Sequence, residues 1–345
     1  MNHFIKKEFR LNLMNNVKPL ACLSLDLDNQ WSYMKIHGDP GWKKYPSYLE
    51  RLVPRILECI DSFNLKITFF IVGQDALFET NRNALAEIVK HGHDIGNHSF
   101  HHEPWLCSCP VSIIRKEIMD AERAIHEATG QKTVGFRGPG FSWSEGLVSV
   151  LAELDYLYDA STLPTYLGPL ARLYYFSKSG LDHEAKQKRR NLFGNVRDGR
   201  RPVRPYLWVL GSNRRLLEIP VTTLPAFKLP FHLSYLLFLN RYSPLLMLDY
   251  LNAAIGLCRL FQTGLSFLLH PLDFLGCDEV PELAFFPGMT LKKEDKIRIF
   301  QGVLRRISRS FQIVDMKTYA NAALGRSQKL GLQPFSQELR FLRRR

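Results

Sequence analysis

The chain has 345 residues, of which 46% are hydrophobic, and a formal net charge of +13. This length and composition are those of a globular protein with one large α/β domain or two small ones. The six cysteines match neither a disulfide framework nor a zinc ribbon, so they favour a reducing compartment.

Strand and helix patterns alternate along most of the chain. The first strand is predicted at 20–28, "LACLSLDLD". The next helix has apolar residues at helical spacing, a capping-box pattern from Ser47 to Glu50, and an expected kink at Pro54. The continuous apolar run at 66–73 predicts a strand buried on both faces.

The same alternation continues beyond residue 73. Further helices are predicted at about 81–91, 112–130, 144–155, 243–262 and 291–308, and further strands at 93–98, 133–137, "YLYDAS", 215–222, 265–270 and 311–316. About seven repeats of strand then helix indicate a parallel sheet that closes, or nearly closes, into a barrel.

The domain organisation follows from where this rhythm holds. We expect a single barrel domain at 20–322, preceded by an N-terminal extension at 1–19 and followed by a basic C-terminal tail at 323–345. The long basic stretch at about 165–215 breaks the rhythm and is expected to be an insertion over one rim.

Basic residues are concentrated in two stretches. Between Lys186 and Arg215 lie ten Lys or Arg residues and one acid, Asp198, and the chain ends in "RFLRRR". Such runs are often solvated faces, but they could also contact an anionic membrane or a phosphate-bearing substrate. Nucleic acid is not an expected partner, because no helix-turn-helix, RNP-like or zinc-finger pattern accompanies the charge.

No secretion signal or membrane span is expected. The first 28 residues lack an apolar core followed by a cleavage site, and polar residues interrupt the most apolar window before it reaches about 20 residues. The part "LPFHLSYLLFLNRY" could lie in a membrane interface, or Leu233, Leu236, Leu237 and Phe238 could pack on the barrel. We therefore expect a cytoplasmic protein, with peripheral contact at the cytoplasmic face of an anionic membrane.

Acids and histidines follow the predicted strands, where barrel enzymes carry their chemistry. Asp26 and Asp28 are two residues apart on one strand, so they face the same side, although such acids also make ordinary turn hydrogen bonds. His98 and His102 are four apart, the spacing that puts two imidazoles on one face of a helical turn. With one carboxylate they would supply three zinc ligands and leave a position open for water.

The motifs that contain these residues resemble those of the polysaccharide deacetylase family, carbohydrate esterase family four. "SLDLD", "NHSFHH", "GFRGPGFS", "YDAS" and "LLHPLD" occur in the family's order and approximate spacing from about residue 20 to 316. The resemblance implies a distorted (β/α)7-type barrel and a metal-dependent hydrolase that acts on non-peptide carbon–nitrogen bonds.

The resemblance also implies a role for each motif residue. Asp26 corresponds to the catalytic base, and Asp28, His98 and His102 correspond to the metal ligands. Arg137 belongs to the Arg-x-Pro motif, and His270 corresponds to the general acid.

Two motifs depart from the family pattern. Gly140 stands where many members carry Tyr, which leaves only a backbone N–H at that position. The usual Asp-x-x-x-Trp motif that tunes the acid histidine is not found, and Asp159 is the candidate by position, although it could equally be an ordinary strand-end acid.

Each role has a physical basis. A bound Zn²⁺, or Co²⁺ or Ni²⁺ in its place, lowers the pKa of water from about 15.7 towards about 7 and polarises an acyl oxygen. Asp26 would take the proton from that water while the planar fork of Arg137 keeps its carboxylate ionised, unless Arg137 is only an ion-pair partner. Gly140 would offer its N–H to the developing oxyanion, or it could be only a turn glycine. His270 would protonate the leaving amine, or it could be structural.

The expected reaction is removal of an acetyl or formyl group from an amino sugar in a glycan or a lipid-linked saccharide. One alternative is an amidase for a cyclic imide or ureide, because the aromatic residues Trp31, Trp105, Phe141 and Trp143 could line either site. Another alternative is a catalytically silent carbohydrate- or membrane-binding protein, but such a protein would normally have lost one of the six motif side chains, and all six are present.

Overall fold

The computed structural model describes residues 18–211, 214–329 and 336–338. The terminal "RFLRRR" and nearly all of the predicted N-terminal extension lie outside the described residues. The described residues include all five motifs that carry the family resemblance.

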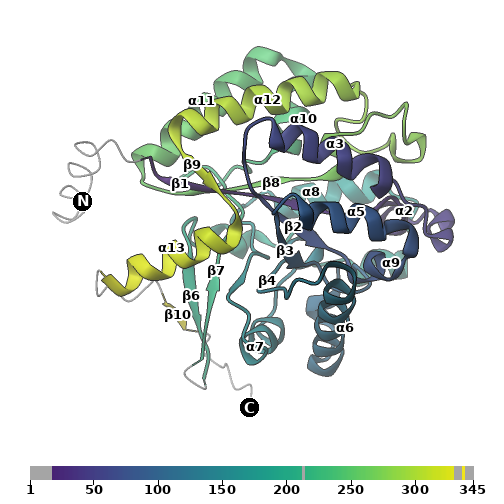
Figure 1. Cartoon of the computed structure of the whole chain (residues 1–345), viewed down its shortest axis with the longest axis horizontal. Coiled ribbons are helices and arrows are strands. Elements are labelled where there is room, and N and C mark those ends of the chain that lie inside the picture. Colours follow the sequence, from purple (N-terminus) through teal and green to yellow (C-terminus); the bar gives the residue numbers. More distant parts are fainter. Residues whose placement is uncertain (1–17, 212–213, 330–335, 339–345) are drawn as a thin grey trace.

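A single mixed sheet forms the centre of the protein (Figure 1). Its strands are β1 (Leu20–Asp26), β2 (Thr68–Ile71), β3 (Asp94–Asn97), β4 (Gly135–Phe136), β5 (Tyr158–Asp159), β6 (Tyr206–Val209), β7 (Arg215–Glu218), β8 (Leu265–Leu269), β9 (Gln312–Val314) and β10 (Ser336–Glu338). The order is β10-β6-β7-β5-β4-β3-β2-β1-β8, and β9 pairs with the first half of β1. Every described pair is parallel except β6 with β7.

The sheet curls until its sixth and seventh barrel strands, β7 and β8, approach each other. No strand ladder joins them, but the chain just after β7 does: the Thr222 N–H donates to the Ser266 carbonyl at 3.0 Å, and the Ser266 N–H donates to Thr222 Oγ1 at 2.7 Å. The predicted distorted (β/α)7-type barrel is therefore confirmed, with an incompletely paired seam between β7 and β8.

Helices surround the sheet (Figure 1). They are α2 (Gln30–His37), α3 (Leu49–Asp61), α4 (Gly73–Leu77), α5 (Glu79–Lys90), α6 (Val111–Thr129), α7 (Glu145–Glu153), α8 (Gly168–Lys178), α9 (His183–Lys188), α10 (Leu233–Tyr242), α11 (Pro244–Leu260), α12 (Lys293–Ser310) and α13 (Met316–Lys329). In α6, Ile114, Ile118 and Ile125 lie on one buried stripe, and the helix ends at Gly130 with φ +71°, as its sequence predicts.

The predicted capping box at Ser47 is wrong. α3 begins at Leu49, with no side-chain cap on Tyr48. The Ser47 hydroxyl accepts the N–H of Leu49, the first residue of α3, at 3.2 Å, and not that of Glu50. It also donates to Asn81 Oδ1 at 2.8 Å and accepts from Asn29 Nδ2 at 2.9 Å. Pro54 lies inside α3 as expected, and the kink there stays a prediction.

The stretch at 165–215 contains regular structure that its composition did not indicate. It folds into α8, α9 and β6, and β6 adds an antiparallel strand beside β7. Two of its arginines are buried: Arg189 is 6% exposed and Arg201 is 8% exposed. The Arg201 guanidinium carbon lies 3.7 Å from the Trp143 ring centroid, and its Nε lies 3.0 Å from Asp198 Oδ1. This basic run is therefore not simply a solvated face.

The apolar stretch around α10 belongs to the core. Leu233, Leu236 and Leu237 are each at most 2% exposed and pack in the main cluster, while Phe238 is half-buried. Of the two readings of this stretch, packing on the barrel is the one observed for these leucines. Within the described residues, none of the helices has the length and apolarity that crossing a bilayer requires.

Candidate active site

The predicted site residues lie at the carboxyl ends of the strands. Asp26 is the last residue of β1, and Asp28 follows it two positions later. His98 directly follows β3, Arg137 follows β4 and His270 follows β8. Because these strands are parallel, their carboxyl ends meet at one rim of the barrel.

Asp28, His98 and His102 form a buried group whose ligand atoms all lie within 4.8 Å of one another. Asp28 Oδ1 is 3.2 Å from His98 Nε2 and 2.9 Å from His102 Nε2. Despite this closeness, Asp28 Oδ1 and His102 Nε2 lack the alignment of a hydrogen bond and have no other partner. Three ligands about 2.0–2.2 Å from a tetrahedral zinc would lie about 3.3 Å apart. The three side chains therefore fit a divalent metal placed between them.

Neighbouring groups set the protonation of this cluster. His98 Nδ1 lies 2.7 Å from the backbone oxygen of Arg137, so Nδ1 carries the proton and Nε2 has the lone pair that a metal needs. Burial alone would raise the pKa of Asp28, but His102 and His98 hold it well below its ordinary value. Burial would lower the pKa of His98, but the carboxylates of Asp26 and Asp28 outweigh it and raise that pKa.

The expected helical turn between His98 and His102 is wrong. This segment is an irregular loop in which Ser99 and His102 have positive φ, at 62° and 54°. The loop needs no helical hydrogen bonds, because Glu117 Oε2 accepts from the Phe100 and His101 N–H groups. The two imidazoles still meet, with ring centroids 5.0 Å apart.

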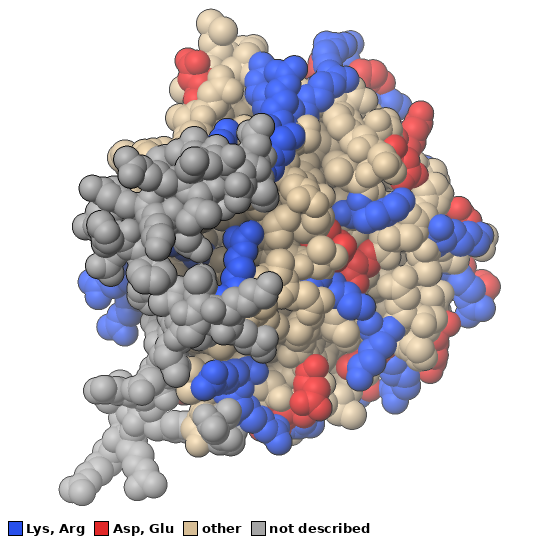
Figure 2. Space-filling model, turned by 60° about the vertical axis from the view of Figure 1, so that its left-hand side comes forward, with Lys and Arg blue, Asp and Glu red and all other residues tan. Residues whose placement is uncertain are grey.

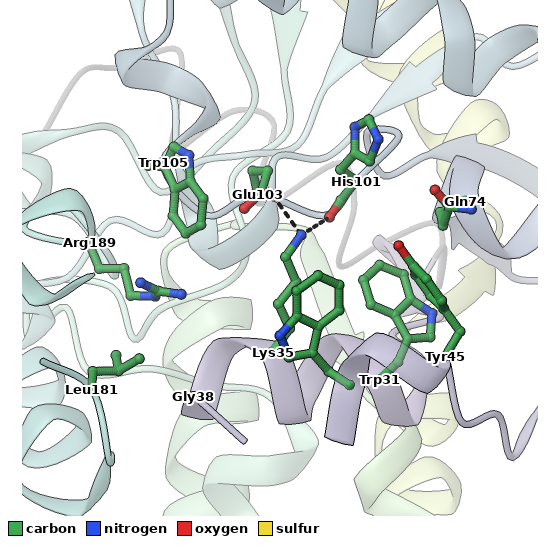
Figure 3. Close-up of a pocket in the computed structure, with 11 residues that line it drawn as sticks. Trp31, Lys35, Gly38, Tyr45, Gln74, His101, Glu103, Trp105, Leu181 and Arg189 are labelled. Atoms are coloured by element: carbon green, nitrogen blue, oxygen red, sulfur yellow. Dashed lines mark hydrogen bonds and ion pairs between the residues drawn. The ribbon is translucent and has the colours of Figure 1, made fainter. Parts of the chain in front are cut away.

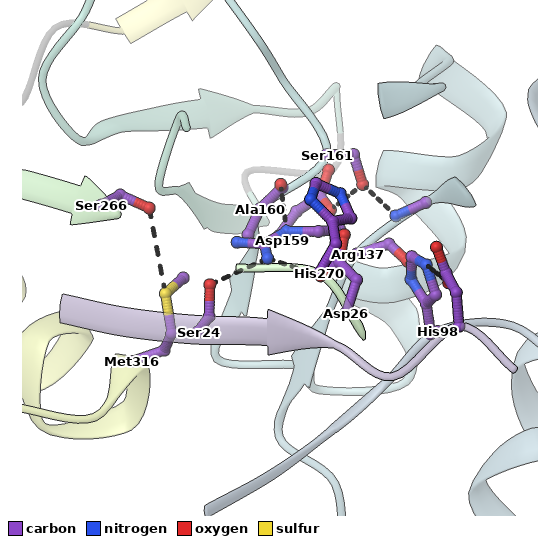
Figure 4. Close-up of polar contacts among 12 residues, drawn as sticks. Ser24, Asp26, His98, Arg137, Asp159, Ala160, Ser161, Ser266, His270 and Met316 are labelled. Carbon is purple, nitrogen blue, oxygen red and sulfur yellow. Dashed lines mark hydrogen bonds and ion pairs between the residues drawn. The ribbon is translucent and has the colours of Figure 1, made fainter. Parts of the chain in front are cut away.

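Arg137 anchors Asp26 beside the metal-ligand cluster (Figure 4). The Arg137 side chain is fully buried, and its Nη1 donates to Asp26 Oδ1 at 2.7 Å and to Ser24 Oγ at 2.9 Å. Its Nε donates to the Ala160 carbonyl at 3.1 Å, and its guanidinium carbon lies 4.3 Å from the Phe70 ring centroid. The two residues thus form a buried ion pair through one nitrogen, rather than the two-nitrogen fork expected from the sequence.

Gly140 has a conformation and a neighbour that explain its identity. Its φ is +64°, and a Cβ built on it would lie 2.5 Å from the Leu192 side chain. Leu192 belongs to the insertion, and the next residue, Phe193, donates its N–H to the Gly140 carbonyl at 3.2 Å. The space that a family tyrosine would enter is therefore taken by the insertion, and the oxyanion role of the Gly140 N–H stays a prediction.

His270 is held by residues that the sequence did not single out. Its Nδ1 lies 3.0 Å from Ser234 Oγ, and that hydroxyl donates to Asp273 Oδ1 at 2.8 Å. Asp273 also accepts the backbone N–H of His270 at 2.8 Å. Burial raises the pKa of Asp273, and His270 opposes that increase. A hydroxyl and a carboxylate therefore orient His270, while His232 lies close by, with ring centroids 6.1 Å apart.

Asp159 contacts a different set of groups. It accepts the Ser161 hydroxyl at 2.5 Å, and it is paired with the buried carboxyl of Glu218. Burial and the Glu218 charge raise the pKa of Asp159 well above its ordinary value. Glu218 in turn accepts from Thr162 and from Trp208 Nε1, at 2.6 and 3.0 Å. The tuning of His270 by Asp159 stays a prediction, and within the described residues no hydrogen bond or ion pair joins the two.

We expect the Asp159→Asn variant to fold and to lose less stability in alkali than the wild type. Because the pKa of the Asp159 carboxyl is raised in the folded protein, the native state holds a proton that the unfolded chain releases. The free energy of unfolding therefore falls as the pH rises through the folded pKa. Asparagine mimics the protonated acid and removes this loss. Urea unfolding between about pH 5 and 9 measures the free energy of unfolding of both proteins. A wild-type free energy of unfolding that rises with pH as steeply as the variant's would contradict the raised pKa of Asp159.

The aromatic residues proposed to line the site separate into two groups. Trp31 and Trp105 line a cavity next to the metal-ligand loop. Trp143 instead stacks on Trp208, with ring centroids 5.2 Å apart. Phe141 lies in the turn after Arg137, at φ 58°.

Sequence reasoning missed Ser234, Asp273, Glu218 and Leu192 as contacts of the site. Asp273 had a local signal, because it ends the quoted motif "LLHPLD", three residues after His270. The other three lie 36 to 59 residues from their partners, so no spacing rule could indicate them.

Two features define the class of protein: a distorted (β/α) barrel and, at one rim, an Asp-His-His cluster beside a buried Asp–Arg pair. The profile of the family described as Polysaccharide deacetylase matches residues 39–158, a range that includes His98, His102 and Arg137. This match, over 120 of the 345 residues, makes the chain similar to the polysaccharide deacetylase family.

Curated relatives match over parts of their length. A peptidoglycan-N-acetylglucosamine deacetylase from Bacillus cereus is 33% identical over 86 residues, which is 25% of this chain and 30% of the relative. A peptidoglycan deacetylase from Helicobacter pylori is 24% identical over 172 residues, 49% of this chain and 52% of the relative. The matches span about half or less of the length of these relatives.

Solved structures show the same fold over nearly the whole chain. A protein described as a polysaccharide deacetylase from Mycobacterium smegmatis has a TM-score of 0.55 at 18% identity, covering 91% of this chain and 96% of that one. The PuuE allantoinase also has a TM-score of 0.55, at 15% identity, with 88% and 90% covered. At these identities the likeness is one of fold alone.

Proposed function

We propose that this chain is a metal-dependent hydrolase that removes an acetyl or formyl group from the nitrogen of an amino sugar, in a glycan or a lipid-linked saccharide. The observation that carries the proposal is the meeting of three ligand atoms from Asp28, His98 and His102 beside the buried Asp26–Arg137 pair. The peptidoglycan deacetylases among the relatives support an N-acylated sugar as the substrate.

Asp28, His98 and His102 would hold the metal, with zinc as the expected ion and cobalt or nickel as alternatives. When bound, such an ion supplies an activated water and polarises the acyl oxygen. The remaining groups act on protons. Asp26 takes the proton from the attacking water, and the hydrogen bond from Arg137 holds its carboxylate in place.

His270 gives a proton to the leaving amine. Its Nδ1 faces the Ser234 hydroxyl, which leaves Nε2 as the nitrogen that can reach a substrate. Asp273 fixes this arrangement through both the hydroxyl and the backbone N–H. The proposed acid and base lie at the carboxyl ends of two adjacent strands, β8 and β1. These strands pair along five residues of each.

Turnover with a substrate panel tests this function. The purified chain, loaded with Zn²⁺, Co²⁺ or Ni²⁺, is incubated with N-acetyl and N-formyl amino sugars, free and lipid-linked, and with a cyclic imide and a ureide. Release of acetate or formate from a sugar supports the proposal. Turnover of the cyclic amides alone would reassign the substrate, and a metal-bound protein with no turnover of any compound would indicate a silent binding protein.

Action at the cytoplasmic face of an anionic membrane also stays a proposal, and it rests on exposed cations such as Arg190 and Arg200. Figure 2 shows one face on which Lys and Arg alternate with Asp and Glu, so no dominant basic patch appears among the described residues there. Sedimentation with vesicles tests it: the wild type should bind anionic vesicles at low salt, and an Arg190→Gln, Arg200→Gln variant should bind them less. Protein that stays in the supernatant under those conditions would favour a soluble substrate.

A further inference from the structure

A cavity of about 450 Å³ adjoins the loop that carries the proposed ligand His102, and the proposed reaction does not use its lining. One wall is α2, with Trp31 and Lys35, and another is the loop after β3, with Glu103 and Trp105. The insertion closes a third side with Arg189. Glu103 directly follows the proposed ligand His102 in the chain, so one loop serves both the metal-ligand cluster and the cavity.

Arg189 is a buried cation without a matching anion. It is 6% exposed, and Figure 3 shows its guanidinium directed into the cavity between Trp105 and Leu181. Its Nη1 donates to the Ala185 carbonyl at 3.0 Å, within its own helical turn, and its Nε has no hydrogen-bond partner. Among the described residues, no carboxylate forms an ion pair with it. The guanidinium carbon lies 4.7 Å from the Trp105 ring centroid, and a ring face compensates a positive charge only in part.

The other charges of the cavity compensate each other. Lys35 Nζ lies 2.6 Å from Glu103 Oε1 and 3.1 Å from the His101 carbonyl. The positive charge of Lys35 and the negative charge of Glu103 therefore compensate each other. The positive charge of Arg189 is not compensated in this way. A buried charge is costly unless it is paired, so the cavity as built lacks one negative charge.

Two further features describe what else a ligand would meet. Glu103 Oε2 is buried and has no partner, so it can accept a hydroxyl from a ligand. Trp42 and Trp105 are partly exposed and add apolar ring surface to the lining, against which the C–H groups of a sugar can pack. The combination is an acceptor for a hydroxyl, flat apolar walls and a single unmatched guanidinium.

We propose that this cavity binds an acidic sugar unit, with the carboxylate or phosphate oxygens of the ligand paired to Arg189 and a ligand hydroxyl donated to Glu103. This proposal rests on the proposed function and narrows its substrate class. The substrate would be an acidic glycan rather than a neutral one. The arginine fork suits either oxyanion, since both present two oxygens at matching spacing.

Binding without turnover tests the proposal, so its result does not depend on whether the chain proves to be a deacetylase. The metal-loaded protein is titrated with a hyaluronan tetrasaccharide, which carries carboxylates and N-acetyl groups, and with the neutral tetramer of N-acetylglucosamine, and tryptophan fluorescence reports binding. We expect the wild type to bind the acidic tetrasaccharide at least about 10-fold more tightly. Competition by inorganic phosphate or by glucuronate distinguishes a phosphate site from a carboxylate site.

The Arg189→Gln variant should lose about 10- to 100-fold in affinity for the acidic tetrasaccharide and little for the neutral one. Arg190→Gln is the matched control, because it makes the same charge change at the exposed neighbouring residue. Equal loss in both variants would show only a general effect of charge and would overturn the site. If Arg189→Gln does not fold, the wild-type comparison still decides: equal affinity for the two tetrasaccharides, with no competition by either anion, overturns the proposal.

Discussion

The His98→Ala, His102→Ala double variant is expected to lose the bound metal and all measurable turnover. The wild type should hold about one divalent ion per chain, because three protein ligands with one open position are what a catalytic zinc takes. Removing two of these ligands leaves only Asp28, which cannot hold the ion alone. Elemental analysis of dialysed protein measures the metal content directly.

His101→Ala provides the control for this variant. His101 lies between the two proposed ligands, but its ring Nδ1 pairs with Glu117 Oε1 at 2.5 Å, and its side chain is about half exposed. The control should keep its metal and its turnover. An unchanged metal content in the double variant would mean that the ion binds at another site.

The Asp26→Asn variant is expected to keep its metal and to lose about 10²- to 10⁴-fold in kcat, which is the usual contribution of a general base. Asparagine can still accept the hydrogen bond from Arg137 Nη1 that Asp26 Oδ1 now accepts, so the side chain should stay in place. It cannot take a proton from water. Near-normal turnover would assign the base to another residue.

Two controls accompany the measurement on Asp26→Asn. Metal content shows that the ligands are intact, and thermal unfolding shows whether Arg137, now without its ionised partner, weakens the fold. A variant that has lost both metal and activity would say nothing specific about proton transfer. In that case Asp26 would be a ligand, and the roles of Asp26 and Asp28 would have to be exchanged.

The sequence predicted what depends on local patterns. Apolar runs and helix caps place the strands and helices, and strand ends place Asp26, His98, Arg137 and His270 on one rim. These features follow from periodicity and from the rule that parallel strands carry their chemistry at their carboxyl ends.

Contacts between distant segments could not be predicted in this way. The pairing of Asp159 with Glu218 joins residues 59 positions apart, on the neighbouring strands β5 and β7, and only the strand order reveals it. The burial of Arg189 depends on how α9 packs against Trp105, for which a basic run gives no signal. The loop from His98 to His102 departs from a helix because Glu117, on α6, supplies the acceptor for its N–H groups.

The contact between Gly140 and Leu192 couples two positions that would otherwise vary independently. A side chain at position 140 would meet the Leu192 Cδ1 methyl group, so tyrosine there would require Leu192 to shift. Changes at these two positions should therefore occur together during divergence. Transplanting the insertion onto a relative should be easiest where the recipient has glycine at this position, because glycine tolerates the positive φ and leaves space for the Leu192 methyl group.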